Sequence, residues 1–157
     1  MIPKAKIRGF EVVKGLQEQD VRLPEQATEH SAGYDFFAIA DATIAPFCGT
    51  TNPRPTLLPT GVKAYMRTGE VLILANRSSN PKKGLLLANS IGVIDADYYE
   101  NEDNDGHIMF AYWNVTDFPV EIKKGDKIGQ GIFMNFLRAD GGGTEAKRKG
   151  GFGHSGN

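Results

Sequence analysis

The sequence predicts an all-β domain, a jelly-roll-like β-sandwich with at most one short helix. Two observations predict this class. First, 19 glycines and 8 prolines among 157 residues indicate frequent turns. Second, short strand-like segments recur between these turns, while a long apolar pattern of period 3.6 with helix caps is missing from the sequence. The nearest approach to a helix is segment 12–21, which Gly15 weakens.

Four segments carry the strand prediction, in chain order. Residues 60–66 alternate between two faces, which is typical of a half-buried strand. The apolar run 71–75 is typical of a strand buried on both faces. Segment 108–115 is rich in aromatic residues, and 127–133 places isoleucines among glycines. We therefore expect strands at these four places.

The length predicts one domain with its own core, residues 1–139, followed by a tail. Segment 140–157 contains seven glycines and one large apolar residue, Phe152, so it cannot bury enough surface to order itself. We expect a flexible C-terminal arm; its part 140–152 could span roughly 40 Å when extended, enough to reach another subunit. Segment 45–59 holds four prolines and is expected to be a surface loop.

Charge and cysteine content exclude several classes. Eighteen basic and 19 acidic residues give a net charge of −1, which argues against a general nucleic-acid binder. The single cysteine, Cys48, excludes an internal disulfide and favours a reducing compartment, so we expect a cytoplasmic protein. The apolar runs are far shorter than the ~20 residues that span a bilayer, and we expect no membrane partner.

Five short polar clusters lie between the strand-like segments. They are Ala32-Gly33-Tyr34-Asp35, Asn76-Arg77-Ser78-Ser79, residues 89–98, residues 125–130 and residues 148–156. In the second cluster, an arginine and two hydroxyls at a strand end can hold phosphate oxygens, although a solvated β-turn explains them as well. The last cluster combines cations, a hydroxyl, an aromatic ring and glycine-rich backbone, which can wrap a triphosphate and stack on a base; a disordered end is the alternative.

The third cluster contains two carboxylates, Asp95 and Asp97. On a strand they would share one face, and two close carboxylates raise the proton affinity of one of them. This arrangement suits a general base or a metal-bound phosphate site. Six acidic residues lie between 95 and 105, so a solvated hairpin fits equally well.

Taken in order, the five clusters resemble the five motifs of trimeric dUTPases, most closely those of Gram-positive bacteria and phages. The resemblance covers residues 6–157. It implies a jelly-roll subunit in a homotrimer with active sites between subunits. The implied reaction is hydrolysis of dUTP to dUMP and pyrophosphate, which lowers dUTP and supplies dUMP for thymidylate synthesis. Mg²⁺, held mainly by the triphosphate, is the implied cofactor.

The resemblance also implies residue roles. Asp95 would be the general base that orients water for attack on the α-phosphorus, and Asp35 would hold metal-bound water or buttress the site. Tyr98 would pack against the deoxyribose and leave no room for a 2′-hydroxyl. Uracil would be read by Asn89 and by backbone at Gly92, Val93, Ile94, Asp95 and Met109; the phosphates would be held by Arg77, Ser78, Ser79 and Gln130; and the arm would contribute Arg148, Phe152, Gly153, His154 and Ser155.

Some features depart from the family pattern. Lys147 holds the position that a longer arm motif gives to arginine, so the phosphate clamp is either Lys147 or Arg148. The hairpin after Tyr98 is lengthened as far as Gly106. Two other readings stay open: a dCTP deaminase-like enzyme, and a non-catalytic binding or regulatory protein on the same scaffold. The enzymatic reading requires that Asp95 face the nucleotide and not be bonded permanently to a protein cation.

Overall fold

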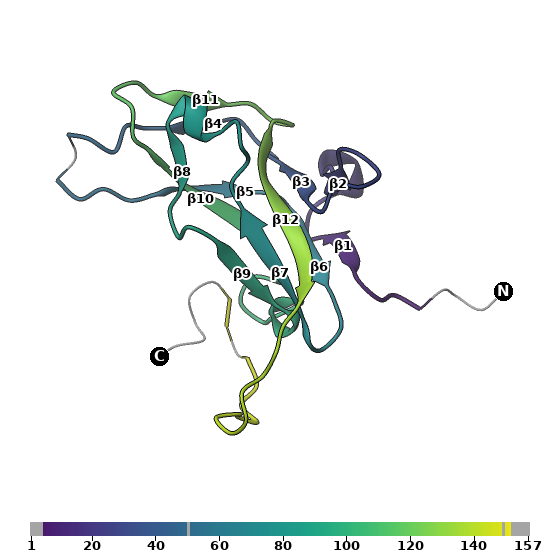
Figure 1. The fold of residues 1–157 in the computed structure, drawn as a ribbon. Coiled ribbons are helices and arrows are strands. Elements are labelled where there is room, and N and C mark those ends of the chain that lie inside the picture. The colour runs from purple at the N-terminus through teal and green to yellow at the C-terminus, as the bar shows by residue number, and fades with distance from the viewer. Residues whose placement is uncertain (1–4, 50, 149, 152–157) are drawn as a thin grey trace.

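Figure 1 shows the fold in a computed structural model of the chain, which describes residues 5–49, 51–148 and 150–151. The regular structure in these ranges consists of β-strands and three 3₁₀-helices of three residues each, with no α-helix. The strands are β1 Gly9–Val12, β2 Glu25–Gln26, β3 Tyr34–Phe37, β4 Ala42–Ile44, β5 Thr56–Pro59, β6 Val62–Tyr65, β7 Glu70–Ala75, β8 Leu85–Leu87, β9 Gly92–Asp95, β10 Met109–Asn114, β11 Val120–Ile122 and β12 Lys127–Asn135. The 3₁₀-helices are η1 Glu18–Asp20, η2 Pro81–Lys83 and η3 Ala96–Tyr98. The all-β prediction is confirmed.

The strands form antiparallel sheets. The largest has five strands in the order β2-β3-β12-β7-β9, and a second has the order β5-β10-β8. Two further pairs, β1 with β6 and β4 with β11, extend the barrel-like body. The four expected strand segments appear as β6, β7, β10 and β12.

Strand β7 explains how the largest sheet is ordered. Its apolar run pairs with β12 on one side and with β9 on the other, so both of its edges are covered. Leu72 and Leu74 point into the core and are 0% and 3% exposed. A run of this kind is stable only in the middle of a sheet, because both faces and both edges are then removed from water.

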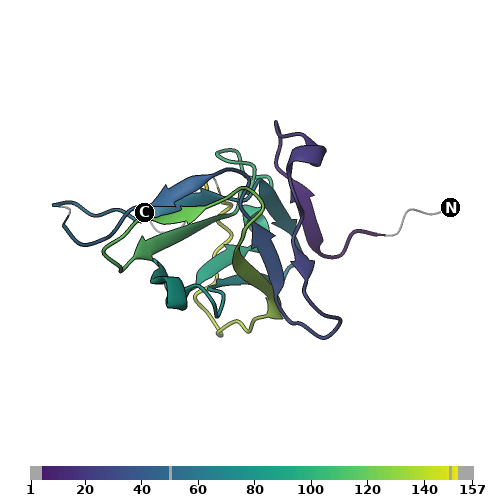
Figure 2. The ribbon, with the colours of Figure 1, turned by 90° about the horizontal axis from the view of Figure 1, so that it is seen from above.

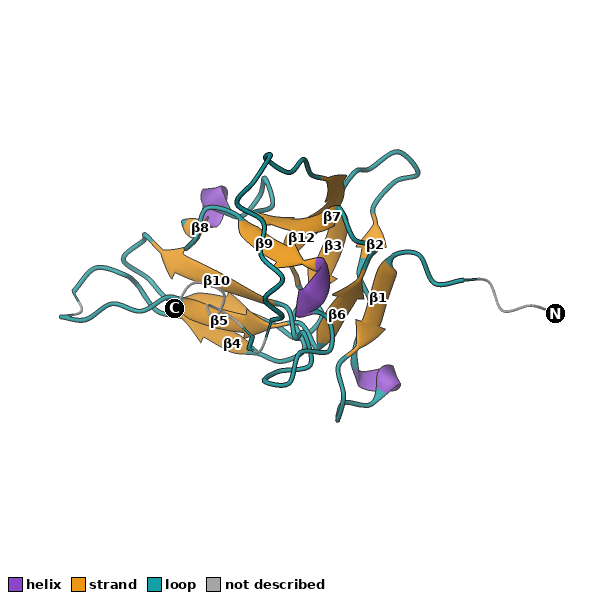
Figure 3. Ribbon diagram, turned by 90° about the horizontal axis from the view of Figure 1, so that it is seen from below, coloured by secondary structure: helices purple, strands orange, loops and turns teal. Residues whose placement is uncertain are grey.

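The core lies between the two larger sheets. Figure 3 shows the five-stranded sheet on one side of the molecule and β5 and β10 on the other. Phe36 of β3 and Phe110 of β10 are fully buried, and their ring centroids lie 5.4 Å apart across the interior. A second aromatic group joins β1 to this sheet, because Phe10 packs on the rings of Phe36 and Phe133.

Two segments leave the body. The proline-rich segment before β5 projects from it, as Figures 1 and 2 both show. After β12 the chain continues without a strand or helix through the described residues of the predicted arm. Within the described part of the chain, no helix has the length and apolar character needed to cross a bilayer.

Candidate active site

The expected site residues gather in two separate groups. The first, named here the β12 cluster, contains the expected residues Asp35, Arg77 and Gln130 together with Lys127, which was not predicted as a site residue. It forms because Gln130 of β12 pairs with Asp35 of β3 on one side and with Ala75 of β7 on the other. Arg77 follows two residues after Ala75, at the end of the same strand. Three of the five sequence motifs are thereby brought together by the register of one sheet.

Two cations surround one carboxylate in the β12 cluster. The Asp35 carboxylate contacts Lys127 Nζ at 2.7 Å and Arg77 Nε at 3.5 Å. Arg77 also donates through Nη1 to the carbonyl of Lys127, at 3.1 Å. Asp35 has a side chain only 14% exposed and that of Arg77 is 27% exposed. The two cations and one carboxylate give the cluster a net charge of +1. Their mutual contacts already hold these side chains in place.

The side-chain amide of Gln130 is held between the backbone of Asn76 and that of Gly33. Its Nε2 donates to the carbonyl of Asn76 at 3.0 Å. A Cβ atom on Gly33 would lie 2.3 Å from Gln130 Oε1, so a larger residue at position 33 would displace this amide. The glycine in the first sequence motif thus has a packing reason.

The turn after β7 rests on a buried polar network that the sequence reading missed. Asn80 Nδ2 donates to Asn76 Oδ1 at 2.8 Å and to the carbonyl of Ile128 at 3.0 Å. Burial raises the pKa of Tyr112 to about 12, so its hydroxyl stays protonated and donates to the carbonyl of Ile128. This network fixes the backbone that leads from Arg77 into Ser78 and Ser79, which are exposed and half-buried. Only the two asparagines flanking the Arg-Ser-Ser run could have suggested it.

The second group, named here the β9 cluster, contains Asp95, Asp97, Tyr98 and Arg148. β9 ends at Asp95, and Asp97 lies in η3 rather than on the strand, so the expected sharing of one strand face is wrong. The two carboxylates still converge, because one guanidinium bridges them. Arg148 Nη2 donates to Asp95 Oδ2 at 2.5 Å, and its Nε donates to Asp97 Oδ1 at 2.9 Å.

Arg148 covers the functional end of β9. Its side chain is 11% exposed, and its guanidinium carbon lies 5.6 Å from the centre of the Tyr98 ring. The carboxylates themselves are 50% and 61% exposed. A bond between Asp95 and a protein cation is therefore present, and the carboxylate side of that bond is open to solvent.

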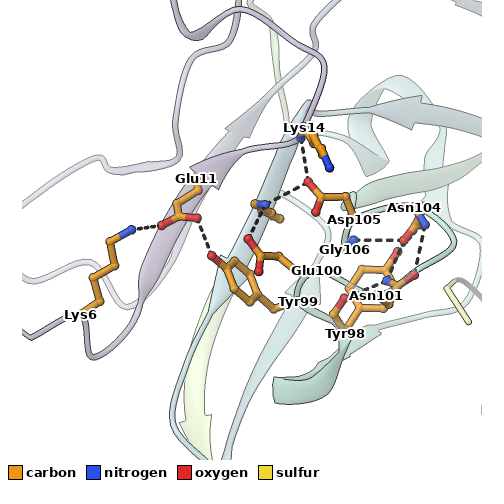
Figure 4. A network of polar contacts seen from close by, with 11 residues as sticks. Lys6, Glu11, Lys14, Tyr98, Tyr99, Glu100, Asn101, Asn104, Asp105 and Gly106 are labelled. Carbon is orange, nitrogen blue, oxygen red and sulfur yellow. Dashed lines mark hydrogen bonds and ion pairs between the residues drawn. The ribbon is translucent and has the colours of Figure 1, made fainter. Parts of the chain in front are cut away.

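Tyr98 is fixed at both ends. It is 4% exposed, and its hydroxyl donates to the carbonyl of His107 at 2.7 Å. The same oxygen accepts a hydrogen bond from Asn104 Nδ2 at 2.8 Å, as the dashed lines of Figure 4 show. Burial raises the pKa of Tyr98, so the hydroxyl remains a donor at neutral pH.

The expected uracil site lies beside the β9 cluster. Asn89 is exposed in the turn before β9, and Gly92, Val93 and Ile94 form that strand. β9 is the last strand of its sheet, so one side of its backbone is not paired with a strand in the described residues. Met109 begins β10, and the neighbouring carbonyl of Ala111 accepts from Ala88 N at 2.8 Å. This places strand backbone from two sheets near the turn.

The two clusters are well apart in one chain. Asp95 pairs with Val71 and Gln130 pairs with Ala75, four residues further along β7. At about 3.3 Å per residue this is a separation of about 13 Å along the strand, to which the distance across the intervening strands is added.

Some predictions fall outside these clusters. Phe152, Gly153, His154 and Ser155 lie outside the described residues. Among the described residues, no group of three or more His, Cys, Asp or Glu side chains could hold a metal ion. Asp35 is the one expected metal contact, and both of its oxygens face cations.

Comparison with known proteins gives one consistent result. A model of the dUTPase family matches residues 19–156. The deoxyuridine 5′-triphosphate nucleotidohydrolase of Lactococcus lactis is 52% identical over 154 residues, covering 96% of this chain and 99% of the relative. The protein of the same name from Actinobacillus pleuropneumoniae is 33% identical, covering 94% and 95%.

Solved structures agree. The dUTPase of Streptococcus mutans superposes with a TM-score of 0.77 at 46% identity, covering 85% of this chain and 99% of that one. A mutant dUTPase from phage phi11 of S. aureus, which coordinates a structural Mg(II) ion, shares the fold with a TM-score of 0.66 at 19% identity, covering 88% and 97%.

Proposed function

The chain belongs to the dUTPase family and is an enzyme that hydrolyses deoxyuridine triphosphate, and we propose that Asp95 is the base of this reaction. A water molecule held by the Asp95 carboxylate attacks the α-phosphorus. The bond from the water oxygen to phosphorus forms, and the bond from that phosphorus to the oxygen bridging to the β-phosphate breaks. Asp95 takes the proton of the water, and the products are dUMP and pyrophosphate.

The observation that carries this proposal is the position of Asp95. Its carboxylate stands half-exposed at the end of β9, next to the buried Tyr98. Arg148 occupies it in the free chain. On binding, the nucleotide phosphates would draw this guanidinium away, so that Arg148 becomes a phosphate clamp and Asp95 becomes free to hold water.

The β12 cluster would receive the phosphates. dUTP carries about four negative charges at neutral pH, which repel an attacking water. Arg77 and Lys127 offset that charge, while Gln130 and the hydroxyls of Ser78 and Ser79 donate hydrogen bonds. Since these groups are already held by Asp35 and by backbone, little reorganisation is needed when the nucleotide binds.

The β9 cluster and its neighbours would read the nucleoside. Tyr98 would lie against the deoxyribose and leave no space for a 2′-hydroxyl. Asn89 and the free backbone edge of β9 would pair with the uracil edge, where a methyl group at C5 would clash. This arrangement excludes thymine and ribose by shape.

Mg²⁺ is proposed as the cofactor. It would be held mainly by the triphosphate, with Asp35 touching it through water. When bound, it neutralises charge on the phosphates and orients them.

We also propose a homotrimer with active sites shared between subunits. The separation of the two clusters along β7 supports it, because one nucleotide bound to both clusters of one chain would have to bridge that separation. Clusters from two copies can be brought together at an interface. A cytoplasmic location is proposed as well, in keeping with the single exposed cysteine, Cys48.

Pyrophosphate release from dUTP, dTTP, dCTP and UTP, with and without Mg²⁺, tests the function. We expect release from dUTP alone, and only with Mg²⁺. Equal release from dTTP or UTP would contradict the proposed nucleoside site. Ammonia release from dCTP would instead indicate a deaminase, a reading that the relatives named as nucleotidohydrolases do not favour.

Mixing two inactive variants tests the shared site. Asp95→Asn and Arg77→Ala damage different clusters, so an oligomer of both variants would contain some sites with both clusters intact. Random mixing in equal amounts would restore about a quarter of the sites. If each site belonged to one chain, unfolding and refolding the variants together would restore no activity. Refolding each variant alone is the control.

A further inference from the structure

The hairpin that follows Tyr98 is held far more firmly than a surface loop requires. Residues 99–108 connect η3 to β10, and three positions with positive φ angles bend them sharply. Glu100 and Asp105 have positive φ angles of 54° and 59°, and Gly106 has a φ of 82°. A Cβ on Gly106 would lie 2.8 Å from the carbonyl oxygen of Tyr98. Non-glycine residues adopt such angles only where surrounding contacts hold them.

The contacts that hold the hairpin come from the body. Lys63 of β6 is 6% exposed, and its Nζ lies 2.9 Å from Asp105 Oδ2 and 3.0 Å from Glu100 Oε1. Burial lowers the pKa of Lys63, but its bonds to the two carboxylates outweigh this and hold the pKa above its ordinary value. Asp105 also accepts from Lys14 N at 2.7 Å, as Figure 4 shows. The hairpin is thus attached to strand β6 through Lys63 and to the turn after β1 through the backbone of Lys14.

Asn104 connects the fixed hairpin to Tyr98 through hydrogen bonds. Its Oδ1 accepts from Asn101 Nδ2 at 2.8 Å and from Gly106 N at 3.2 Å. With its oxygen held in this way, its Nδ2 is aimed at the Tyr98 hydroxyl, 2.8 Å away. The phenolic hydroxyl thus donates one hydrogen bond, to the His107 carbonyl, and accepts one, from Asn104 Nδ2. The phenolic end of the ring therefore cannot shift away from this position without breaking one of these bonds.

We propose that Asn104 is a positioning residue that sets the sugar specificity of the enzyme by fixing the ring of Tyr98. The inference rests on the proposed function, in which Tyr98 lies against the deoxyribose. A ring that can yield would admit a 2′-hydroxyl, whereas a ring anchored at its far end cannot. Specificity for deoxyribose then depends on a hairpin residue that does not touch the nucleotide.

The test compares kcat/KM for dUTP and for UTP in four proteins: the full-length chain, Asn104→Ala, Tyr98→Phe and the double variant. Asn104→Ala is expected to lower the dUTP to UTP ratio by about tenfold, the effect of one buried hydrogen bond. Tyr98→Phe removes the anchored oxygen and should lower the ratio to a similar extent. In the Tyr98→Phe background, Asn104→Ala should cause no further loss.

The ratio separates positioning from simple destabilisation. Both constants are measured on the same sample, so a reduced fraction of folded enzyme cancels out. Glu102→Ala is the matched control, because Glu102 is an exposed residue of the same hairpin; it should leave the ratio unchanged. If Asn104→Ala does not fold, Asn104→Asp replaces it, because the carboxylate keeps an oxygen for Asn101 Nδ2 and Gly106 N but cannot donate to the Tyr98 hydroxyl.

Two failures are distinguishable. An unchanged dUTP to UTP ratio in Asn104→Ala, with dUTP hydrolysis present, overturns the role of Asn104 but not the proposed function, whatever Tyr98→Phe shows. A full-length chain that releases no pyrophosphate from dUTP overturns the proposed function itself, and the inference with it.

Discussion

The β12 cluster and the β9 cluster are held in place by different means. In the first, strand register sets the positions: Gln130 pairs with two strands at once, and the cations are held by Asp35. In the second, positions depend on side-chain hydrogen bonds within a long hairpin and on an arginine from the C-terminal segment. Binding a triphosphate requires charged groups at fixed positions, whereas a nucleoside site must discriminate between bases and between sugars. In the proposed function, the sheet supplies the fixed charges and the hairpin supplies the discrimination.

The largest effect should come from the carboxylate of the β9 cluster. Asp95→Asn is expected to lower kcat for pyrophosphate release by about 10²–10⁴-fold, the usual contribution of a positioned general base, because the amide cannot accept the proton. Titration calorimetry should show that dUTP still binds. Turnover near that of the unchanged chain would remove Asp95 as the base.

The next effect tests the framework of the β12 cluster. Arg77→Ala should lower kcat/KM for dUTP by about 10–100-fold, because it removes charge-assisted hydrogen bonds to phosphate. Lys123→Ala is the control, since Lys123 is an exposed cation paired only loosely with Asp41, at 3.5 Å. Equal losses in the two variants would mean that general charge, and not the cluster, attracts the nucleotide.

A smaller effect is expected for Arg148, the residue of the C-terminal arm that contacts Asp95 and Asp97 in the β9 cluster. If Arg148 moves from Asp95 to a phosphate, Arg148→Ala should lower kcat/KM for dUTP by about tenfold. Lys147→Ala should change it little, which assigns the clamp to Arg148. The pyrophosphate assay checks both. Higher activity in Arg148→Ala would instead mean that this arginine only masks the carboxylates.

The smallest effect concerns stability beside Tyr98. His107 accepts a hydrogen bond from Gly61 N at its Nε2, at 2.8 Å, and burial lowers the pKa of His107. Below the ordinary histidine pKa of about 6.5, the unfolded chain therefore binds a proton that the folded chain resists, so the free energy of unfolding should fall as pH decreases through this range. At higher pH both states are neutral at this residue and the contribution is constant.

His107→Gln provides the matched comparison, because a glutamine oxygen can accept the same hydrogen bond without titrating. Urea unfolding at pH 7.5 and 5.5 should show a smaller loss of stability in this variant than in the unchanged chain. The same loss in both proteins would assign the acid sensitivity to other groups.

The sequence predicted the central strands well and the short ones poorly. β6, β7, β10 and β12 carry alternating or continuous apolar patterns that only burial in a sheet explains. β2 and β11, of two and three residues, are too short for any pattern to develop. Their existence depends on neighbours distant in the chain, which local preference cannot reveal.

The same distinction between local pattern and long-range contact applies to the site residues. Asp35, Arg77, Gln130, Asp95 and Tyr98 were predicted as site residues because each stands in a short motif of chemically meaningful residues. The anchor from Asn104 to Tyr98 was not, because it depends on three positive φ angles and on Lys63 from another strand. The pairing of Arg148 with Asp95 was also beyond reach, since 53 residues separate them and the arm carries no strand pattern.

The close contact at Gly33 limits which residues the chain can accept at this position during evolution. Loop positions usually accept almost any residue, yet here even a methyl group would collide with the amide of Gln130. A library randomised at position 33 and selected for growth on enzyme activity should be enriched in glycine, because any side chain there must displace the Gln130 amide. The same library at Gly143, whose surroundings are open, should return a broad spectrum. Two glycines that look alike in the printed sequence thus differ in mutational freedom.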